Sequence, residues 1–284
     1  MVEIIPLWLV NLLSFVTVVL VMTSIGTTVA FTDLLQQLRA PSLLLRGLAS
    51  VLVLVPAAGF VCAFALGLTL PEKVGVVLMA MAPGAPLALR RVLSSGGDNA
   101  YGPALQACVV LCAVPALPIW VAIGNAILGT HGVVEVASVA RQVFLAQLLP
   151  LALGATARHF APRRIAVIGR VIGRAGAILL VAALVAQVVD LQQILLAARL
   201  KPMLAAAIIT LFALLTGRLF GGPLPTVQHA IAISASLRNV GLALLVATSN
   251  RTPPIVEEVI ITYWLAAFLV VTVYILWRGR RREA

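Results

Sequence analysis

Charged side chains are scarce in this chain, since only 10% of its 284 residues are Asp, Glu, Lys or Arg. Soluble domains carry about 25% charged residues, so the composition excludes an ordinary water-soluble globular protein. Acidic residues are the rarest, nine against 20 basic ones, which leaves a net charge of +11. In a soluble protein that charge would suggest a nucleic-acid partner. In so apolar a chain we expect basic loops at a lipid bilayer instead, and no nucleic acid as partner.

Residues that bind metals or form disulfides are also few. The three cysteines, Cys62, Cys108 and Cys112, all fall in apolar stretches. Cys108 and Cys112 share a helix face, but no histidine or third cysteine accompanies them, so we interpret them as packing residues rather than as a soft-metal pair. The sequence therefore predicts no disulfide framework, no metal site and no cofactor. It also predicts no enzyme, because the apolar stretches hold no Ser/His, paired-Asp or metal-ligand cluster.

Apolar sequence is what the chain has in abundance: 62% of it is hydrophobic, and its mean hydropathy is +1.12. A helix that crosses a bilayer takes about 20 such residues. Nine stretches fit that length: Ile5–Phe31, Leu43–Leu66, Val74–Leu93, Ala100–Leu128, Val136–Ala157, Ile165–Val189, Pro202–Phe220, Thr226–Thr248 and Ile255–Trp277. The expected fold class is an all-α membrane protein, one transmembrane domain over residues 1–284 with nine transmembrane helices and a short basic tail at 278–284.

The distribution of basic residues predicts how the chain lies in the membrane. If the C-terminus is cytoplasmic, nine spans place most arginines in inner loops, while the few basic residues of the outer loops are diluted by acidic ones. Positively charged loops stay on the cytoplasmic side. We therefore expect an integral multi-pass protein of the cell (inner) membrane, with its N-terminus outside and its C-terminus in the cytoplasm.

Two of the nine spans have polar or helix-breaking residues at or near their centres. These are Pro83, Gly84, Ala85, Arg90 and Arg91 in the third span, and Ser234, Ser236, Arg238 and Asn239 in the eighth. An arginine at the middle of a bilayer costs about 3 kcal/mol on insertion scales, so it faces protein, water or an anion. Because interrupted helices that line a cavity have this composition, we expect both spans to be discontinuous.

The two unusual spans hold corresponding positions in the chain. Each is third in a run of four spans, about residues 5–128 and 136–277, and the two runs start from opposite sides of the membrane. The stretch Ala-Leu-Arg-Arg-Val at 88–92 also echoes Ser-Leu-Arg-Asn-Val at 236–240. Interrupted helices at corresponding positions of inverted halves indicate a transporter site near the midplane. We therefore expect inverted repeats whose two discontinuous helices cross there.

Shorter patterns predict local contacts. The spacings Gly169-x-x-x-Gly173 and Gly217-x-x-x-Gly221 are typical of close helix packing. Asp98, in the turn after the third span, is expected to cap the fourth span rather than to carry protons.

Motifs spread over the chain carry a family resemblance. They are Met22-Thr-Ser-Ile-Gly26, Asp33, Arg39-Ala-Pro41, Pro56, Ala82-Pro-Gly84, Gly97-Asp98, Ile231-Ala-Ile and Asn239-Val-Gly-Leu-Ala243. In these motifs, over about residues 7–278, the chain resembles the bile acid:sodium symporter family. The resemblance implies a core domain and a panel domain, with the third and eighth spans unwound and crossing near the midplane. It also implies that the chain corresponds to the nine-helix members of a family whose common form has ten helices.

The same resemblance implies that sodium ligands are missing. Sodium-coupled members carry Glu and Gln where this chain has Ser234 and Arg238, and a Ser-Asn pair where it has Ala88-Leu89. Two further ligand hydroxyls of the family fall at Gly102 and Gln106. Because sodium requires oxygen ligands and is repelled by a guanidinium, we expect both family sodium sites to be lost.

These patterns together predict a secondary transporter of a small organic anion that works by alternating access without sodium. The expected substrate contacts are Arg238, Asn239, Ser234, Ser236, Pro83, Gly84, Ala85, Arg90 and Arg91. Arg238 either anchors the acid group of the substrate or ties unwound backbone together, and Arg90 and Arg91 either add a contact or reach the cytoplasm. A sodium-coupled symporter with rearranged ion sites, an arsenite exporter and a non-transporting membrane sensor are the alternatives. The oligomeric state stays open.

Overall fold

The computed structural model describes residues 7–28, 41–84, 86–129, 134–188 and 200–283, so that Ala85, Asp33 and Arg39 lie outside the described residues. Every regular element in these ranges is a helix. In chain order these are α1 (Leu7–Gly26), α3 (Pro41–Ala49), the π-helical turn η1 (Ser50–Leu54), α4 (Val55–Ala65), α5 (Leu70–Met81), α6 (Pro86–Ser94), α7 (Tyr101–Leu128), α8 (Val136–Val143), the π-helical turn η2 (Phe144–Leu148), α9 (Leu149–Phe160), α10 (Pro162–Val188), α12 (Leu200–Phe220), α13 (Pro225–Ser236), α14 (Val240–Ser249) and α15 (Pro254–Glu283).

Six helices in the described residues are long and apolar enough to cross a membrane. They are Pro41–Ala65, Tyr101–Leu128, Val136–Phe160, Leu200–Phe220, Pro225–Ser249 and Pro254–Arg280, and each coincides with an expected span. The other three expected spans fall on α1, on α5 with α6, and on α10. The chain is thus an all-helical, multi-pass membrane protein, whereas the count of nine spans and the inverted repeats stay predictions.

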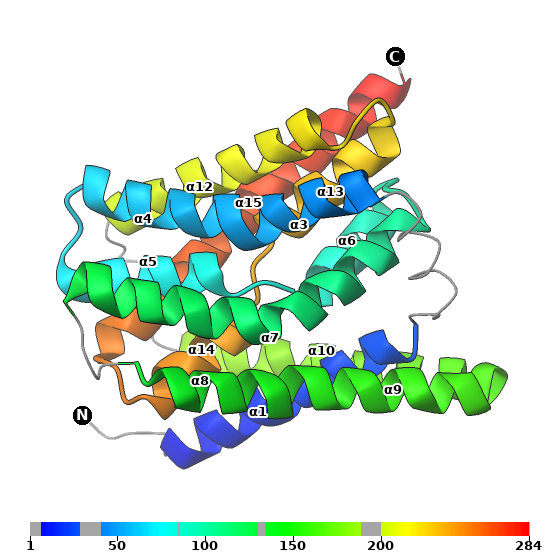
Figure 1. The fold of residues 1–284 in the computed structure, drawn as a ribbon, viewed down its shortest axis with the longest axis horizontal. Helices are drawn as coiled ribbons and strands as arrows, with labels where there is room; N and C mark the ends of the chain where they lie inside the picture. The colour runs from blue at the N-terminus through cyan, green and yellow to red at the C-terminus, as the bar shows by residue number, and fades with distance from the viewer. Residues whose placement is uncertain (1–6, 29–40, 85, 130–133, 189–199, 284) are drawn as a thin grey trace.

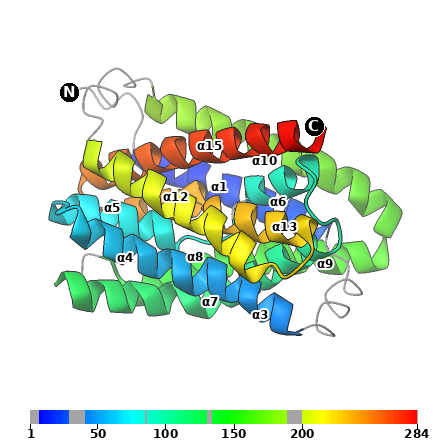
Figure 2. The ribbon, with the colours of Figure 1, turned by 90° about the horizontal axis from the view of Figure 1, so that it is seen from above.

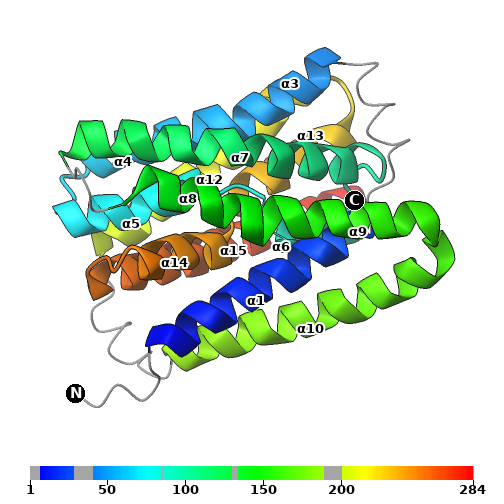
Figure 3. The same cartoon turned by 60° about the horizontal axis from the view of Figure 1, so that its bottom comes forward.

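The helices pack in two groups (Figure 1). The smaller group, which we call the α1 layer, consists of α1, α8, η2, α9 and α10, and Figure 3 shows α1 between α9 and α10. Glycines bring α10 close to α1, since a Cβ at Gly169 would meet the Thr27 side chain and one at Gly173 would meet Ser24. The first glycine spacing is therefore a helix contact, as predicted.

The remaining helices form a larger group around a common apolar core. Figure 2 shows α12 lying between α4 and α15. A Cβ at Gly217 of α12 would meet the backbone of Ala232 on α13, and one at Gly221 would meet the backbone of Gln228. The second glycine spacing is confirmed as a helix contact too. Where the two groups meet, a second buried cluster joins α1, η2 and α9 to α7 and α14, while the buried valines of α8 belong to the first core.

Each π-helical turn stands just before a proline, since Pro56 follows η1 and Pro150 follows η2 by two residues. Proline has no N–H to donate, and its ring clashes with the carbonyl one turn earlier, so the helix widens there. The carbonyl of Leu52, four residues before Pro56, instead accepts a hydrogen bond from Trp120 Nε1 at 2.7 Å. The proline thus leaves backbone acceptors free inside an apolar helix.

The helical backbone is interrupted at two places that the sequence singles out. α5 ends at Met81 and α6 begins at Pro86, and Gly84 between them has a φ of +78°. That left-handed conformation is available to glycine without steric strain. The second interruption separates α13, which ends at Ser236, from α14, which begins at Val240.

Candidate functional site

The two interruptions touch each other. The backbone N–H of Asn239, in the second interruption, donates to the carbonyl of Ala82, in the first, at 2.9 Å. The side-chain oxygen of Asn239 caps α14 by accepting the N–H of Leu242 at 3.1 Å. Its side-chain nitrogen is buried and has no hydrogen-bond partner. We call this contact between residues 82–84 and 237–239 the crossing.

Arg238 ties three segments together at the crossing. Its side chain is only 2% exposed. One terminal nitrogen donates to the carbonyl of Val51 in η1 at 2.9 Å, and the other donates to the carbonyl of Ala80 near the end of α5. The Val51 carbonyl stands five residues before Pro56, whose nitrogen carries no hydrogen to bond it across a π turn. The guanidinium therefore donates to two carbonyls that lack a backbone donor, one because of Pro56 and the other because α5 ends.

The other expected residues of the crossing are buried around this tie. Ser236 donates its hydroxyl to the carbonyl of Ala232, whereas the hydroxyl of Ser234 has no partner. Pro83 and Gly84 are both buried. A Cβ on Gly84 would lie 3.1 Å from Val110 Cγ2 and 3.7 Å from Gln106 Nε2 of α7. The crossing therefore packs directly on α7.

A cavity of about 390 Å³ lies between the α1 layer and α6, and no residue of the crossing lines it. Its walls come from the end of α1, from α6, from the start of α7 and from α10. Its polar lining residues are Ser24, Thr28, Arg90 and Asn99. The cavity therefore lies where the two helix groups meet, with one cationic side chain in its wall.

Arg90 and Arg91 lie in different environments, although they are neighbours in α6. Arg90 lines the cavity, and a Cβ on Gly173 across it would lie 3.0 Å from Arg90 Nη2. The absence of a side chain at Gly173 thus leaves room for the guanidinium. Arg91 turns the other way, with its Cζ 4.9 Å from the ring centroid of Phe268 on α15, in the geometry of a cation–π contact.

Two acidic side chains near the interruptions serve helix starts. Glu72 accepts the N–H of Thr69 at 2.8 Å at the start of α5. Asp98 accepts the N–H groups of Ala100 and Tyr101 at 3.0 and 2.8 Å, which confirms the predicted cap of α7. Within the described ranges, no group of three or more His, Cys, Asp and Glu side chains could hold a metal ion.

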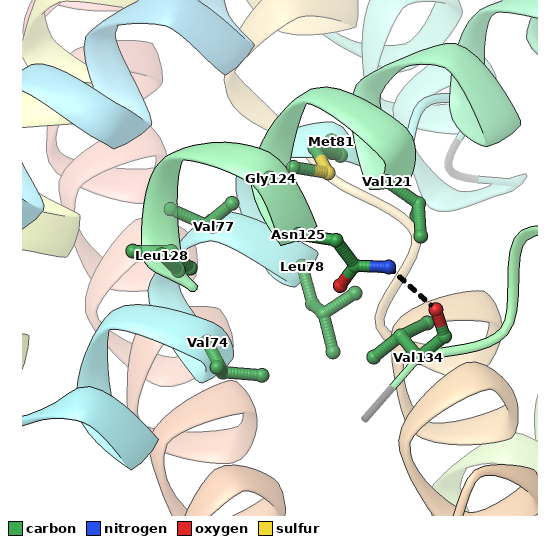
Figure 4. A pocket seen from close by; sticks show the side chains of 9 residues that line it. All are labelled: Val74, Val77, Leu78, Met81, Val121, Gly124, Asn125, Leu128 and Val134. Atoms are coloured by element: carbon green, nitrogen blue, oxygen red, sulfur yellow. Dashed lines mark hydrogen bonds between the residues drawn. The ribbon is translucent and has the colours of Figure 1, made fainter. Parts of the chain in front are cut away.

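A second, much smaller cavity is not a substrate site. It measures about 20 Å³ and lies between α5, α7 and Val134, among apolar side chains (Figure 4). Asn125 donates to the carbonyl of Val134 at its edge, at 2.8 Å. Because a single water needs about 10–15 Å³ measured in this way, the cavity holds little more than one water molecule.

Of the expected contacts that the structure describes, only Arg90 lines the cavity, and several lining residues were not expected. Ser24, Asn99 and Gly173 line the cavity, and none of them was an expected contact. The backbone partners of Arg238 were missed as well. One available signal was Pro56, because a proline inside a long apolar stretch marks carbonyls that need other donors.

Comparison with known proteins adds a family and a relative. Residues 15–215 match the Sodium Bile acid symporter family. The chain is also similar to the probable chloroplastic sodium/metabolite cotransporter BASS2 of Oryza sativa subsp. japonica, with 26% identity over 258 residues. That match covers 88% of this chain and 59% of the relative, so the chain spans less than two thirds of the relative's length.

Proposed function

The chain belongs to the sodium bile acid symporter family, and from that membership we propose that it is a secondary transporter of a small organic anion, working without sodium. The observation that carries the proposal is the cavity of about 390 Å³ with Arg90 in its wall. Sites for small molecules measure about 300–1,000 Å³, so the size fits a metabolite. A guanidinium is always charged and binds carboxylate, sulfate or phosphate through two parallel hydrogen bonds, which supports an anionic substrate.

The place of the cavity supports alternating access. Its walls combine the α1 layer with helices of the larger group, so a movement of one group against the other would open or close it. The crossing lies next to this interface, because Val110 of α7 belongs to the buried cluster between the groups and also lies against Gly84. In the proposal, Arg90 anchors the acid group while Ser24 and Asn99 line the space around the rest of the substrate.

Independence from sodium is supported by the chemistry of the crossing. Sodium prefers oxygen ligands, and here the guanidinium of Arg238 occupies the carbonyls of Val51 and Ala80. Ala88 and Leu89, at the place of a Ser-Asn pair in sodium-coupled members, are buried and offer no side-chain oxygen. Arg238 would hold the crossing together permanently, in the role that a bound cation has in those members.

The proposal is tested by thermal unfolding of the purified protein with a panel of small organic anions, in sodium chloride and in choline chloride. We expect at least one anion to raise the melting temperature equally in both salts. Arg90→Gln should abolish that shift. Arg174→Gln is the matched control, because Arg174 is exposed on α10 next to Gly173 but does not line the cavity. A shift that survives Arg90→Gln would refute the anchoring role, and no shift with any anion would count against the function.

A sodium-coupled symporter is the second candidate, and the name of the rice relative favours it, since that protein is a probable sodium/metabolite cotransporter. The same experiment separates the two. If the ligand raises the melting temperature in sodium chloride but not in choline chloride, sodium takes part in binding and the sodium-independent proposal is wrong.

A further inference from the structure

Two fully buried polar side chains lie in the closed part of the interface, beyond the deep end of the cavity. Gln147 of η2 is 0% exposed, and neither its amide nitrogen nor its amide oxygen has a hydrogen-bond partner. Thr17 of α1 is 2% exposed, and its hydroxyl also has none. Buried polar groups in native proteins are nearly always paired, because an unpaired one is costly. Two unpaired side chains on neighbouring elements therefore require an explanation.

Thr17 continues the face of α1 that lines the cavity. Val21, Ser24 and Thr28 are lining residues, and Thr17 precedes them by four, seven and eleven residues. That spacing keeps a residue on one side of a helix. At 1.5 Å per residue, Thr17 lies about 10 Å from Ser24 along the helix axis. The polar face thus runs on past the cavity into the closed part of the interface.

The interface is sealed at the level of Thr17 and Gln147. Val18, which follows Thr17, and Ala146, which precedes Gln147, belong to one buried cluster with Val110 of α7 and Leu245 of α14. This cluster joins the α1 layer to the larger group, so it separates the cavity from the opposite end of the interface. We call it the seal.

The turn η2 resembles η1, but the two turns differ in how their hydrogen-bonding groups are paired. At η1, Arg238 and Trp120 donate to the carbonyls that Pro56 leaves free. At η2, Pro150 likewise has no N–H for the carbonyls one turn before it. The amide of Gln147 beside them is unpaired. η2 therefore presents hydrogen-bonding groups at a helix distortion, which is a frequent feature of functional sites.

We propose that Thr17 and Gln147 line the substrate path beyond the seal and bind the substrate in the state that opens to the opposite face of the membrane. This inference rests on the proposed function, because it requires the two helix groups to separate. A glutamine amide and a threonine hydroxyl both donate and accept hydrogen bonds without charge. They fit a hydroxyl, carbonyl or amide group of the substrate, while Arg90 binds its acid group in the cavity. The substrate class is therefore a small organic acid with a second, uncharged polar group.

The test is the accessibility of single cysteines in a background in which Cys62, Cys108 and Cys112 are replaced by alanine. Thr17→Cys, Gln147→Cys and Ser24→Cys are each treated with a membrane-impermeant maleimide in intact cells and in inverted membrane vesicles. Ser24→Cys should react from the face to which the cavity opens. Thr17→Cys and Gln147→Cys should react from the other face.

Ala213→Cys is the control, because Ala213 of α12 is 0% exposed and belongs to the apolar core of the larger group. The two path cysteines should react at least about tenfold faster than this control, a ratio that corresponds to about 1.4 kcal/mol. Reaction no faster than the control, in variants that unfold at the wild-type temperature, would overturn the proposal. Reaction from the same face as Ser24→Cys would overturn it as well. Neither result would bear on anion binding at Arg90, so the two failures are distinguishable.

A binding measurement tests whether Gln147 recognises an uncharged polar group of the substrate. Acids that differ by one hydroxyl, malate and succinate, are compared on the wild type and on Gln147→Leu, which removes the amide at similar size. The wild type should bind the hydroxylated acid more tightly, and Gln147→Leu should lose that preference while keeping its fold. The same ratio of affinities in both proteins would contradict the role of Gln147.

Discussion

Arg238 illustrates how a single charge is accommodated among apolar helices. Its two terminal nitrogens donate to the carbonyls of Val51 and Ala80, which a proline and a helix end leave without their usual donors. Hydrogen bonds to a charged group contribute about 1.5–3 kcal/mol each, and a buried acceptor that loses its donor costs about 1–3 kcal/mol. At this residue, the terminal nitrogens of one cation satisfy carbonyls at two distant irregularities of the backbone, while its Nε is buried without a partner.

We predict that Arg238→Gln lowers the free energy of unfolding by about 2–5 kcal/mol, because two buried carbonyls lose their donor. Arg90→Gln should change it by no more than about 0.5 kcal/mol, because Arg90 is exposed and its guanidinium faces a cavity. Chemical unfolding of both variants in detergent measures the difference. Equal stabilities would show that Arg238 is not a structural tie.

At the scale of the helices, the interruption between α5 and α6 depends on Gly84. Its φ of +78° is unfavourable for any residue with a Cβ, and the nearest side chain across the contact, that of Val110, stands only 3.1 Å from where that Cβ would be. Gly129 has a similar φ of +66°, but nothing lies within 4 Å of its Cβ position. Substitutions at the two glycines therefore distinguish the cost of backbone strain, which arises at both, from the cost of crowding, which arises only at Gly84.

Gly84→Ala is expected to destabilise the protein more than Gly129→Ala does. Both substitutions add the strain of a left-handed residue, about 1–2 kcal/mol, and only the first also forces α7 away from the crossing. Thermal unfolding of the two variants checks this order. Equal losses would mean that α7 yields without cost at this contact.

The contact between α12 and α13 depends on Gly217 in a different way. A side chain there would enter the backbone of α13 at Ala232. We expect Gly217→Leu to lower the free energy of unfolding by about 1–3 kcal/mol, the usual range for overpacking. Gly279→Leu is the control, since nothing lies within 4 Å of its Cβ position. If the two variants are equally stable to unfolding, α13 can shift away from α12 without cost.

At the scale of the whole molecule, the proposed function depends on the two helix groups and on the cavity that they share. Neither group encloses the cavity alone, because its walls come from α1 and α10 on one side and from α6 and α7 on the other. A rigid union of the groups would trap a solute, whereas their relative movement would release it. In the proposed function, the few polar residues of this interface, Arg90 foremost, would determine which solutes enter.

The orientation of the whole chain is a further prediction. The nine predicted spans would place the two termini on opposite faces, and the basic residues after Trp277 favour the cytoplasm for the C-terminus. Green fluorescent protein fused after Ala284 should fluoresce, and alkaline phosphatase fused at the same place should be inactive. The reverse pattern would place the C-terminus outside and would invalidate the assignment of inner and outer loops.

The sequence by itself determined the helical membrane fold and the places where helices are interrupted. The interior of a bilayer has no water to bind the backbone, so each backbone N–H and C=O needs a partner within the protein. A helix supplies these partners within one segment, and an apolar stretch of about 20 residues therefore indicates a membrane-spanning helix. Pro83-Gly84 and Arg238-Asn239 break that pattern visibly. Asp98 and the paired glycines were equally readable, because a cap and a small residue act on their immediate neighbours.

Only the tertiary structure decided which groups meet. Val51 and Arg238 are separated by 187 residues, and nothing local to either names the other. Arg90 and Arg91 are adjacent in sequence, yet one lines the cavity and the other stacks on Phe268. Thr17 and Gln147 look unremarkable in sequence and stand out only by their burial without partners. Helix formation depends on residues within one turn, whereas partners across an interface depend on how whole helices pack.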